Sequence, residues 1–248
     1  FLDLVCVGTA TQTEVEEQVD LMYSLIHQQL DAIVLVPIDS KALVQPVVEA
    51  VRKGVPVINI DIRLDTQLLE QAGVEVAFVG PDNFAAAYEV GKLLDKKLRN
   101  EDKVAIIEGL AAADNAQQRK RGFIKAIEEK GLRLVASEPA DWETEKAAEV
   151  FQAMWMRYPD LKAVYCSNDA MALGVLQQMQ EKNCYLPVVG FDNDAVMKEF
   201  LSTGKLVATA DIFSSQMAVR GIEFALDVLE GKIENRGVHS TAYEIIKQ

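Results

Sequence analysis

Short apolar runs alternate with amphipathic segments along almost the whole chain. The runs, such as AIVLVP at 32–37 and VPVINI at 55–60, contain almost no polar residue. Strands of this kind are typical of a parallel sheet covered on both faces, because neither side of such a strand meets water. The amphipathic segments carry apolar residues at three- and four-residue intervals, which predicts helices. In the first of these segments, the apolar residues are Val15, Val19, Met22, Ile26 and Leu30.

The regular alternation of such strands and helices predicts parallel, right-handed α/β layers. One helix is expected from Ser40, as its N-cap, to Lys53, because serine favours that position and Gly54 then ends the helix. The other helices are expected at 15–30, 83–99, 115–130, 144–157, from 169 onward, 194–203 and 214–230. The strands are expected at 2–8, 32–37, 55–60, 76–80, 104–109, 132–137, 161–167, 187–191 and 205–211, and the last helix is followed by the tail AYEIIK at 242–247.

So many strands would make a single sheet unusually wide for 248 residues, which favours two lobes. No change of composition and no low-complexity linker separates them. The N-terminal lobe is predicted to comprise residues 1–81 and 213–241, and the C-terminal lobe residues 82–212 and 242–248. The chain would then cross between the lobes near Gly80-Pro81, Asp211-Ile212 and Thr241-Ala242.

Charge and composition exclude several classes of protein. Acidic residues number 38 against 25 basic ones, for a net charge of −13, and such a surface repels nucleic acid. No apolar run approaches the roughly 20 residues of a membrane span. The first residues, FLDLVCV, lack the basic segment and cleavage signature of a signal peptide. The three cysteines are too scattered for a disulfide framework or a zinc site.

Motifs of common enzymes are also missing from the sequence. No G-x-G-x-x-G follows a predicted strand, and no G-x-S-x-G elbow occurs. The two histidines, His27 and His239, are far apart and have no partners at ligand spacing. We therefore expect a protein that is not an enzyme, with no catalytic residue, cofactor or bound metal.

Polar residues stand where four of the predicted strands end. In a parallel sheet the carboxyl ends lie along one edge, so these side chains are predicted to converge on a site for a small polar molecule. They are Asp61 after VPVINI, Trp142 after LVASEPAD, Asn168-Asp169 after LKAVYCS, and Asp192-Asn193 after LPVVGF.

Seven segments occur in an order that is typical of a known family. They are VPVINID with the acidic stretch that follows it, VAFVGPDN, NAQQRKRGF, ASEPADW, VYCSNDAMALG, VVGFDN and GKLVATA. Together they resemble the sugar-binding periplasmic binding proteins of type I, in the ribose- and allose-binding branch, over essentially the whole chain. The resemblance implies two Rossmann-like α/β lobes, joined by a three-strand hinge, that close on one monosaccharide.

The resemblance also implies a role for five residues. Asp61 would accept hydrogen bonds from sugar hydroxyl groups, and Arg119 would donate to hydroxyl groups or to the ring oxygen. Trp142 would stack on the apolar face of the ring, while Asn168 and Asp192 would complete the polar contacts. Each residue also has a purely structural reading. Asp61 and Asp192 would be helix N-caps or loop carboxylates, and Asn168 would cap the helix that follows it. Arg119 would belong to a basic helix segment with solvated neighbours, and Trp142 would be ordinary core.

The chain departs from the family pattern in three places. It opens at what resembles the second strand, so we expect that a strand and helix of roughly 30 residues are absent at the start. A glutamine of the family falls on Ile212, which either removes one contact or transfers the task to Asp211. An arginine of the ribose-binding pattern lies one position later here, at Arg63, which makes Arg63 a weaker candidate than Asp61.

The expected function is the delivery of a monosaccharide to the membrane permease of an ABC importer. The protein would be a monomer that is periplasmic, or extracellular and lipid-anchored, and would not bind nucleic acid. The alternative is a ligand-sensing domain of a sugar-responsive transcriptional regulator or membrane receptor, since sugar-responsive repressors share the fold. The sequence does not distinguish among ribose, allose, galactose, psicose and inositol.

Overall fold

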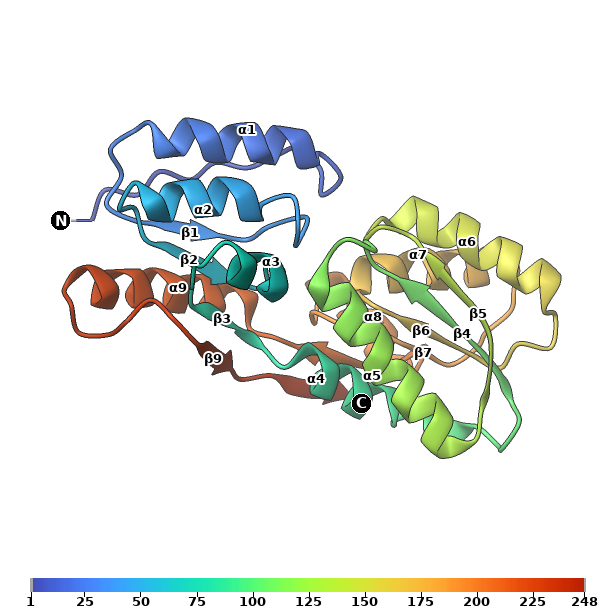
Figure 1. The fold of residues 1–248 in the computed structure, drawn as a ribbon. Helices are drawn as coiled ribbons and strands as arrows, with labels where there is room; N and C mark the ends of the chain where they lie inside the picture. Colours follow the sequence, from blue (N-terminus) through green and yellow to red (C-terminus); the bar gives the residue numbers. More distant parts are fainter. Residues whose placement is uncertain (1, 248) are drawn as a thin grey trace. The chain divides into compact units, whose positions relative to one another are not determined.

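The computed structural model describes residues 2–247, and only the backbone of Asp95. Phe1 and Gln248, the outer ends of the predicted lobes, lie outside the described residues. The helices are α1 Val15–Ile26, α2 Val44–Arg52, α3 Thr66–Gln71, α4 Asn83–Gly91, η1 Leu94–Lys97, α5 Asp114–Lys130, α6 Thr144–Arg157, α7 Asp169–Glu181, η2 Ala195–Met197, α8 Lys198–Ser202 and α9 Ser214–Leu229 (Figure 1). The strands are β1 Ile33–Leu35, β2 Val57–Ile60, β3 Phe78–Pro81, β4 Lys103–Glu108, β5 Arg133–Pro139, β6 Ala163–Cys166, β7 Val188–Val189, β8 Leu206–Asp211, β9 Val238–Thr241 and β10 Glu244–Lys247.

The chain forms two compact units, each built from discontinuous segments. Unit 1 comprises residues 1–80, 112–114 and 215–240, and unit 2 comprises residues 81–111, 115–214 and 241–248. Each unit contains its own sheet and its own core.

The sheet of unit 1 has the order β1-β2-β3-β9, and β1, β2 and β3 run parallel. One apolar cluster, with Met22 of α1, Val47 of α2 and Val57 of β2, covers one face of this sheet. Helix α9 covers the other face, where a side chain on Gly221 would come within 2.8 Å of Ile60. The four residues of β2 are all buried, as the uninterrupted apolar run predicted.

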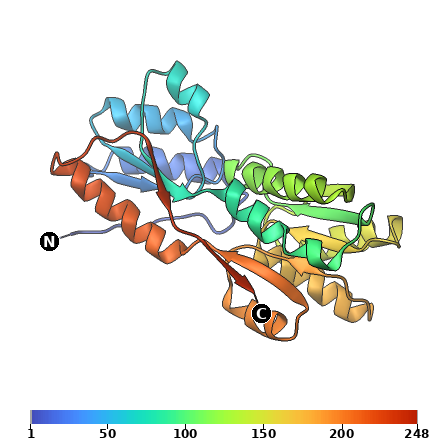
Figure 2. The same ribbon diagram turned by 90° about the horizontal axis from the view of Figure 1, so that it is seen from below.

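The sheet of unit 2 has the order β10-β8-β7-β6-β4-β5. Helices α4 and α5 lie on one face, and α6 and α7 lie on the other (Figure 2). Glycines allow close helix packing on both faces. A side chain on Gly122 of α5 would meet the backbone of α4 at 2.4 Å, and one on Gly174 of α7 would meet the Thr144 carbonyl oxygen of α6 at 2.0 Å.

The structure corrects three expectations. Residues 2–8 form no strand: their N–H and C=O groups pair with no described strand, and Leu2 and Leu4 are 57% and 61% exposed. Ser40 caps no helix, because α2 begins at Val44; the Ser40 hydroxyl group instead accepts a hydrogen bond from the Asp114 backbone N–H. The sheet of unit 2 is not wholly parallel, since β10 runs antiparallel to β8.

The structure also differs from the prediction in two added elements and in one helix that is shorter than expected. Helix α3 and strand β9 were not predicted, since each is a short element with few apolar residues. The helix expected at 83–99 ends at Gly91 and is followed by the 3₁₀ turn η1. No helix within residues 2–247 combines the length and the apolar character needed to cross a membrane.

Candidate functional site

The candidate site of unit 2 lies along the carboxyl edge of its sheet. Strands β4, β6, β7 and β8 run parallel to one another, so the residues that follow each of them lie along the same edge. These residues are Gly109 after β4, Ser167 and Asn168 after β6, and Asp192 after β7, while Asp211 ends β8. Within unit 2, these strand-end residues therefore lie along one edge of the sheet.

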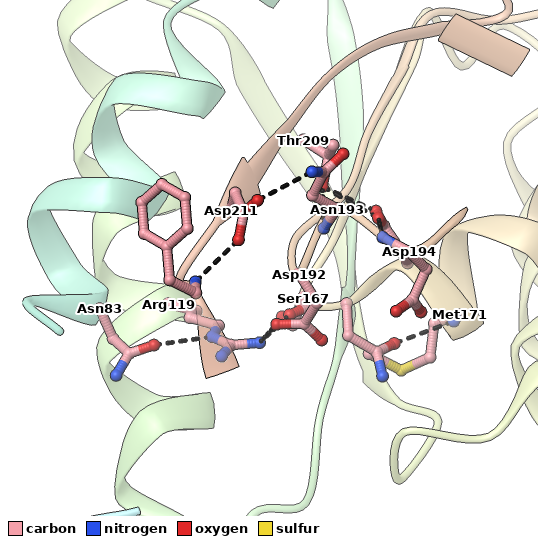
Figure 3. Close-up of polar contacts among 12 residues, drawn as sticks. Asn83, Arg119, Ser167, Met171, Asp192, Asn193, Asp194, Thr209 and Asp211 are labelled. Atoms are coloured by element: carbon pink, nitrogen blue, oxygen red, sulfur yellow. Dashed lines mark hydrogen bonds and ion pairs between the residues drawn. The ribbon is translucent and has the colours of Figure 1, made fainter. Parts of the chain in front are cut away.

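Arg119 of α5 is the centre of this cluster and is only 3% exposed. Its Nε donates to Asn83 Oδ1 at 2.9 Å, and its Nη1 donates to the carbonyl oxygen of Ser167 at 2.8 Å (Figure 3). The same Nη1 lies 3.3 Å from Asp192 Oδ1, which forms an ion pair. Contacts with three separate elements hold the guanidinium group in one orientation. Arg119 itself therefore does not belong to the solvated face of this helix.

Aromatic rings complete the surroundings of the Arg119 guanidinium group. Its Cζ lies 3.7 Å from the centroid of the Phe191 ring and 5.5 Å from that of the Trp142 ring. Such cation–π contacts are strongest when water is excluded. Among the described residues, none hydrogen-bonds to Nη2, so two N–H groups of a rigid, buried fork are available to a ligand.

Trp142 is held by an unusual turn after β5. Asp141 and Trp142 have φ angles of 53° and 71°, in the left-handed region that residues other than glycine seldom adopt. The indole ring is 7% exposed, and its Nε1 is buried without a hydrogen-bond partner among the described residues. Backbone strain and an unpaired buried donor are both features that cluster at ligand sites.

Gly109 provides the space for the Trp142 ring. A side chain on Gly109 would lie 2.1 Å from Trp142 Cη2. We expect Gly109→Ala to displace the ring, lowering the unfolding free energy by about 1–3 kcal/mol through overpacking and weakening ligand binding as well. Thermal unfolding and titration calorimetry would measure the two effects. Gly8→Ala is the control, since nothing lies within 4 Å of that position; equal behaviour of the two variants would contradict this role.

Asn168 is both a helix cap and a candidate ligand contact. Its Oδ1 accepts the Met171 backbone N–H at 2.9 Å and caps α7, so the capping reading of this residue is confirmed. The Nδ2 group has no hydrogen-bond partner among the described residues. The cap fixes the orientation of the amide group, which leaves its donor side for a ligand.

Asp211 braces the turn that carries Asp192. Its Oδ2 accepts from Asn193 Nδ2 at 2.8 Å, and its Oδ1 accepts from the Phe213 backbone N–H at 2.7 Å (Figure 3). Both carboxylate oxygens therefore have partners within the chain. Ile212, at the position of the family's glutamine, is 4% exposed and belongs to the core.

The turn after β7 itself has a strained backbone. Asp192 and Asn193 have φ angles of 104° and 58°, which side chains other than glycine rarely adopt. Asp192 retains 30% of its side-chain exposure, although it pairs with the buried Arg119. An ion-paired carboxylate that is still partly exposed is well suited to accept hydrogen bonds from the hydroxyl groups of a ligand.

The candidates Asp61 and Arg63 belong to unit 1 and follow β2. Asp61 has a φ angle of 61°, and buried Asn59 holds the turn through the Ile62 carbonyl oxygen and the Leu64 backbone N–H, both at 2.8 Å. The Arg63 guanidinium carbon lies 5.6 Å from the Phe78 ring centroid. The turn fixes the direction of Asp61, whereas Arg63 already packs against an aromatic ring.

Sequence reasoning missed several buried polar residues near Arg119. Asn83 and Ser167 contact Arg119 directly, and Asn115 lies one helical turn before it on the same face of α5. Among the described residues, Asn115 Oδ1 and Ser167 Oγ are buried without a partner. The available signal was position: Asn83 follows a strand end, and Asn115 is spaced i, i+4 from Arg119. No group of three His, Cys, Asp or Glu side chains within the described part of the chain could hold a metal ion.

Asp169, which was predicted to lie at this edge beside Asn168, is joined there by Thr209, which was not predicted. Asp169 is fully buried, and its carboxylate accepts from the Thr209 hydroxyl group at 2.9 Å and from the Asp194 backbone N–H at 2.9 Å. Burial raises the pKa of Asp169 to about 7, and the negative charge of Asp192 adds to this rise. A buried carboxyl group that titrates near neutrality, one residue after Asn168, is unusual for a purely structural position.

Comparison with known proteins places these features in a family. Residues 2–233 match the family described as periplasmic binding protein domain. A D-ribose/D-allose-binding protein of Pseudomonas aeruginosa is 40% identical over 98% of this chain and 78% of its own length. The D-allose-binding periplasmic protein of Escherichia coli is 33% identical over 89% of this chain and 72% of its own length.

Solved structures give the same result. A solute-binding protein of an ABC transporter from Burkholderia multivorans has a TM-score of 0.95 and 38% identity, covering 99% of this chain and 87% of its own. A periplasmic solute-binding protein from Actinobacillus succinogenes, solved with D-allose bound, has a TM-score of 0.87 and 32% identity, covering 94% and 84%. The resemblance predicted from the sequence is thus confirmed: this chain belongs to the periplasmic binding protein family, in the branch that contains the ribose- and allose-binding proteins.

Proposed function

We propose that this protein binds one monosaccharide reversibly and delivers it to the membrane permease of an ABC importer. The observation that carries the proposal is the cluster around Arg119, in which a buried guanidinium fork, the Asp192 carboxylate and the Trp142 ring lie together. The names of the relatives supply the class of ligand. Family membership implies a periplasmic protein, and the proposed state is a monomer that acts without covalent chemistry.

The chemistry of a sugar fits this cluster. A sugar ring has hydroxyl groups on its edge and apolar C–H groups on its faces. The free N–H groups of Arg119, the Asn168 amide and the Asp192 carboxylate suit the edge, since hydrogen bonds to charged groups are worth roughly 1.5–3 kcal/mol each. The Trp142 indole ring suits the apolar face, and its unpaired Nε1 adds a donor.

Ribose and allose are the leading candidates, because the relatives from Pseudomonas aeruginosa and Escherichia coli are named for them. A ligand that leaves a buried donor or acceptor of the site unpaired loses binding free energy equal to the desolvation penalty of that group. The site should therefore discriminate strongly between epimers. Asn115 Oδ1 and Ser167 Oγ, which are buried without a partner among the described residues, belong to residues next to Arg119 and are candidates for a part in that choice.

Isothermal titration calorimetry tests the proposed function. The full chain would be titrated with D-ribose, D-allose, D-galactose, D-psicose and myo-inositol. We expect saturable binding of at least one sugar, with one site per chain, and weaker or no binding of its epimers. Absence of saturable binding to every member of the panel would contradict the proposal.

The two units correspond, in this proposal, to the two lobes that the sequence predicts. The resemblance implies that Asp61 of unit 1 contacts the same sugar, and that hinge closure follows binding. These points are predictions from the sequence. They are tested by variants in unit 1 rather than by the geometry of unit 2.

Asp61→Ala is expected to weaken sugar binding by about 10- to 100-fold, which corresponds to one or two hydrogen bonds to a charged acceptor. Arg63→Ala is the matched comparison, because Arg63 lies two residues away and packs on Phe78. It should change the affinity by less than about threefold. Calorimetry would measure the affinity of both variants. A larger loss of affinity in Arg63→Ala than in Asp61→Ala would show that Arg63, and not Asp61, is the ligand contact.

A further inference from the structure

Asp169 is fully buried and forms a hydrogen bond with the turn that carries Asp192. It is the first residue of α7, and its Oδ2 accepts the Asp194 backbone N–H at 2.9 Å. The Thr209 hydroxyl group of β8 donates to the same carboxylate, at 2.9 and 3.0 Å from its two oxygens. The carboxylate thus connects the start of α7, the turn after β7 and strand β8.

The same network also holds Asn193, one of the two residues of the turn that have a positive φ angle. Thr209 Oγ1 also accepts the Asn193 backbone N–H at 3.2 Å, so Asp169 acts on Asn193 through the threonine. Gly190 allows this arrangement, since a side chain there would lie 2.0 Å from Asp169 Oδ1. Backbone strain at Asp192 and Asn193 persists only where surrounding contacts hold it.

We propose that Asp169 is a positioning residue: its ionised carboxylate holds the turn that carries Asp192, and sugar affinity falls when Asp169 is protonated. The inference rests on the proposed sugar-binding function. The hydrogen bonds from Thr209 and from the Asp194 backbone N–H all use the carboxylate as the acceptor. Protonation converts one oxygen into a donor and removes the charge, and hydrogen bonds to a charged acceptor are about twice as strong as neutral ones.

The charged neighbours of Asp169 allow this titration near neutral pH. Asp192 and Asp194 face it from the turn after β7, and the Cys166 thiol faces it from β6. Strand β8 contributes Thr209, which does not titrate. None of these groups is a cation, and burial raises the pKa of Asp169 to about 7.

Stability and affinity should respond to acid in opposite directions. The pKa of Asp169 in the folded protein is above the value of about 3.9 for an unfolded chain. Between about pH 4 and 7 the folded state therefore binds more protons, and the contribution of Asp169 to the unfolding free energy rises as the pH falls. The proposed effect on sugar affinity has the opposite sign, because the ionised form is the one that holds the turn.

The test is the pH profile of sugar affinity for the wild-type protein and for Asp169→Asn. We expect the wild-type dissociation constant to increase about tenfold from pH 8.5 to 5.5, which corresponds to weakening of one or two charged hydrogen bonds. Asp169→Asn should bind about tenfold more weakly than the wild type at pH 8.5 and show little change with pH. A wild-type affinity that is constant over this range would overturn the proposal.

Asp194→Asn is the control. Partial burial also raises the pKa of the Asp194 carboxyl group, although the residue as a whole is exposed to solvent. The variant keeps the Asp194 backbone N–H that donates to Asp169. It should retain the wild-type profile. If Asp194→Asn removes the pH dependence and Asp169→Asn keeps it, the titrating group is Asp194 and the proposal is wrong.

A measurement without ligand separates this inference from the proposed function. The Asp194 amide proton donates to Asp169, so its chemical shift in the sugar-free protein should titrate with a midpoint near 7 and lose this transition in Asp169→Asn. If the chemical shift shows this transition but the protein binds no sugar, the contacts of Asp169 are supported and the proposed sugar-binding function is rejected. Sugar binding without the transition would reject the role of Asp169 alone.

Discussion

Arg119→Ala is expected to abolish measurable sugar binding and to destabilise the protein more than any other single change near the site. The variant removes the guanidinium group that donates to Asn83 Oδ1 and the Ser167 carbonyl oxygen and that pairs with the Asp192 carboxylate. Loss of the two buried hydrogen bonds, together with a partly exposed ion pair, costs roughly 3–5 kcal/mol. For a chain of this size that predicts a fall in the melting temperature on the order of 10 °C.

The loss of affinity has a separate origin. The two N–H groups of Nη2 are the donors left for a ligand, and each bond to a charged group is worth roughly 1.5–3 kcal/mol. We therefore expect at least about a 100-fold loss, measured by calorimetry at a temperature where the variant is folded. Arg119→Lys keeps the charge but not the planar fork, so it should recover part of the stability and little of the affinity.

Arg121→Ala is the matched control for this prediction. Arg121 lies two residues further along α5 and is exposed, so the substitution removes the same charge from the same helix without touching the cluster. Its melting temperature and affinity should stay close to those of the wild type. Arg121→Ala and Arg119→Ala with equal losses would show that charge, and not the buried fork, is what matters.

Trp142→Ala should produce the second-largest effect. Truncation of a buried tryptophan costs about 3–5 kcal/mol of stability, through lost contacts and the cavity left next to Gly109. Sugar affinity should fall about 30- to 100-fold, because the variant removes the ring that borders Arg119 and that we propose to stack on the sugar face. Thermal unfolding and calorimetry give the two numbers.

Two further variants show which part of Trp142 matters. Trp142→Phe keeps a ring but removes Nε1, so a loss of about 3- to 10-fold would correspond to one neutral hydrogen bond from the indole to the ligand. Trp155→Phe leaves Trp142 as the single tryptophan, since the chain has two. Its fluorescence should then change on addition of the bound sugar. If the Trp142 fluorescence does not change at saturating sugar concentration, the ring lies outside the site.

The hydrophobic pattern was sufficient to predict most elements and the α/β class. Uninterrupted apolar runs predicted β2, β4 and β6 because strands buried on both faces need no alternation. The pattern failed at residues 2–8, because an apolar composition does not supply the neighbouring strand that takes the backbone hydrogen bonds. It also failed at β10, since strand direction depends on how the chain returns and not on which residues it contains.

The sequence by itself determined the family, the class of fold and the strand ends at which polar residues would gather. Only the tertiary structure decided what each polar residue does. It assigned both oxygens of Asp211 to bracing contacts and Oδ1 of Asn168 to a helix cap, and it surrounded Arg119 with Asn83 and Ser167. The physical reason is that hydrogen bonds and burial depend on groups brought together from distant parts of the chain. Spacing along the sequence records none of those distances.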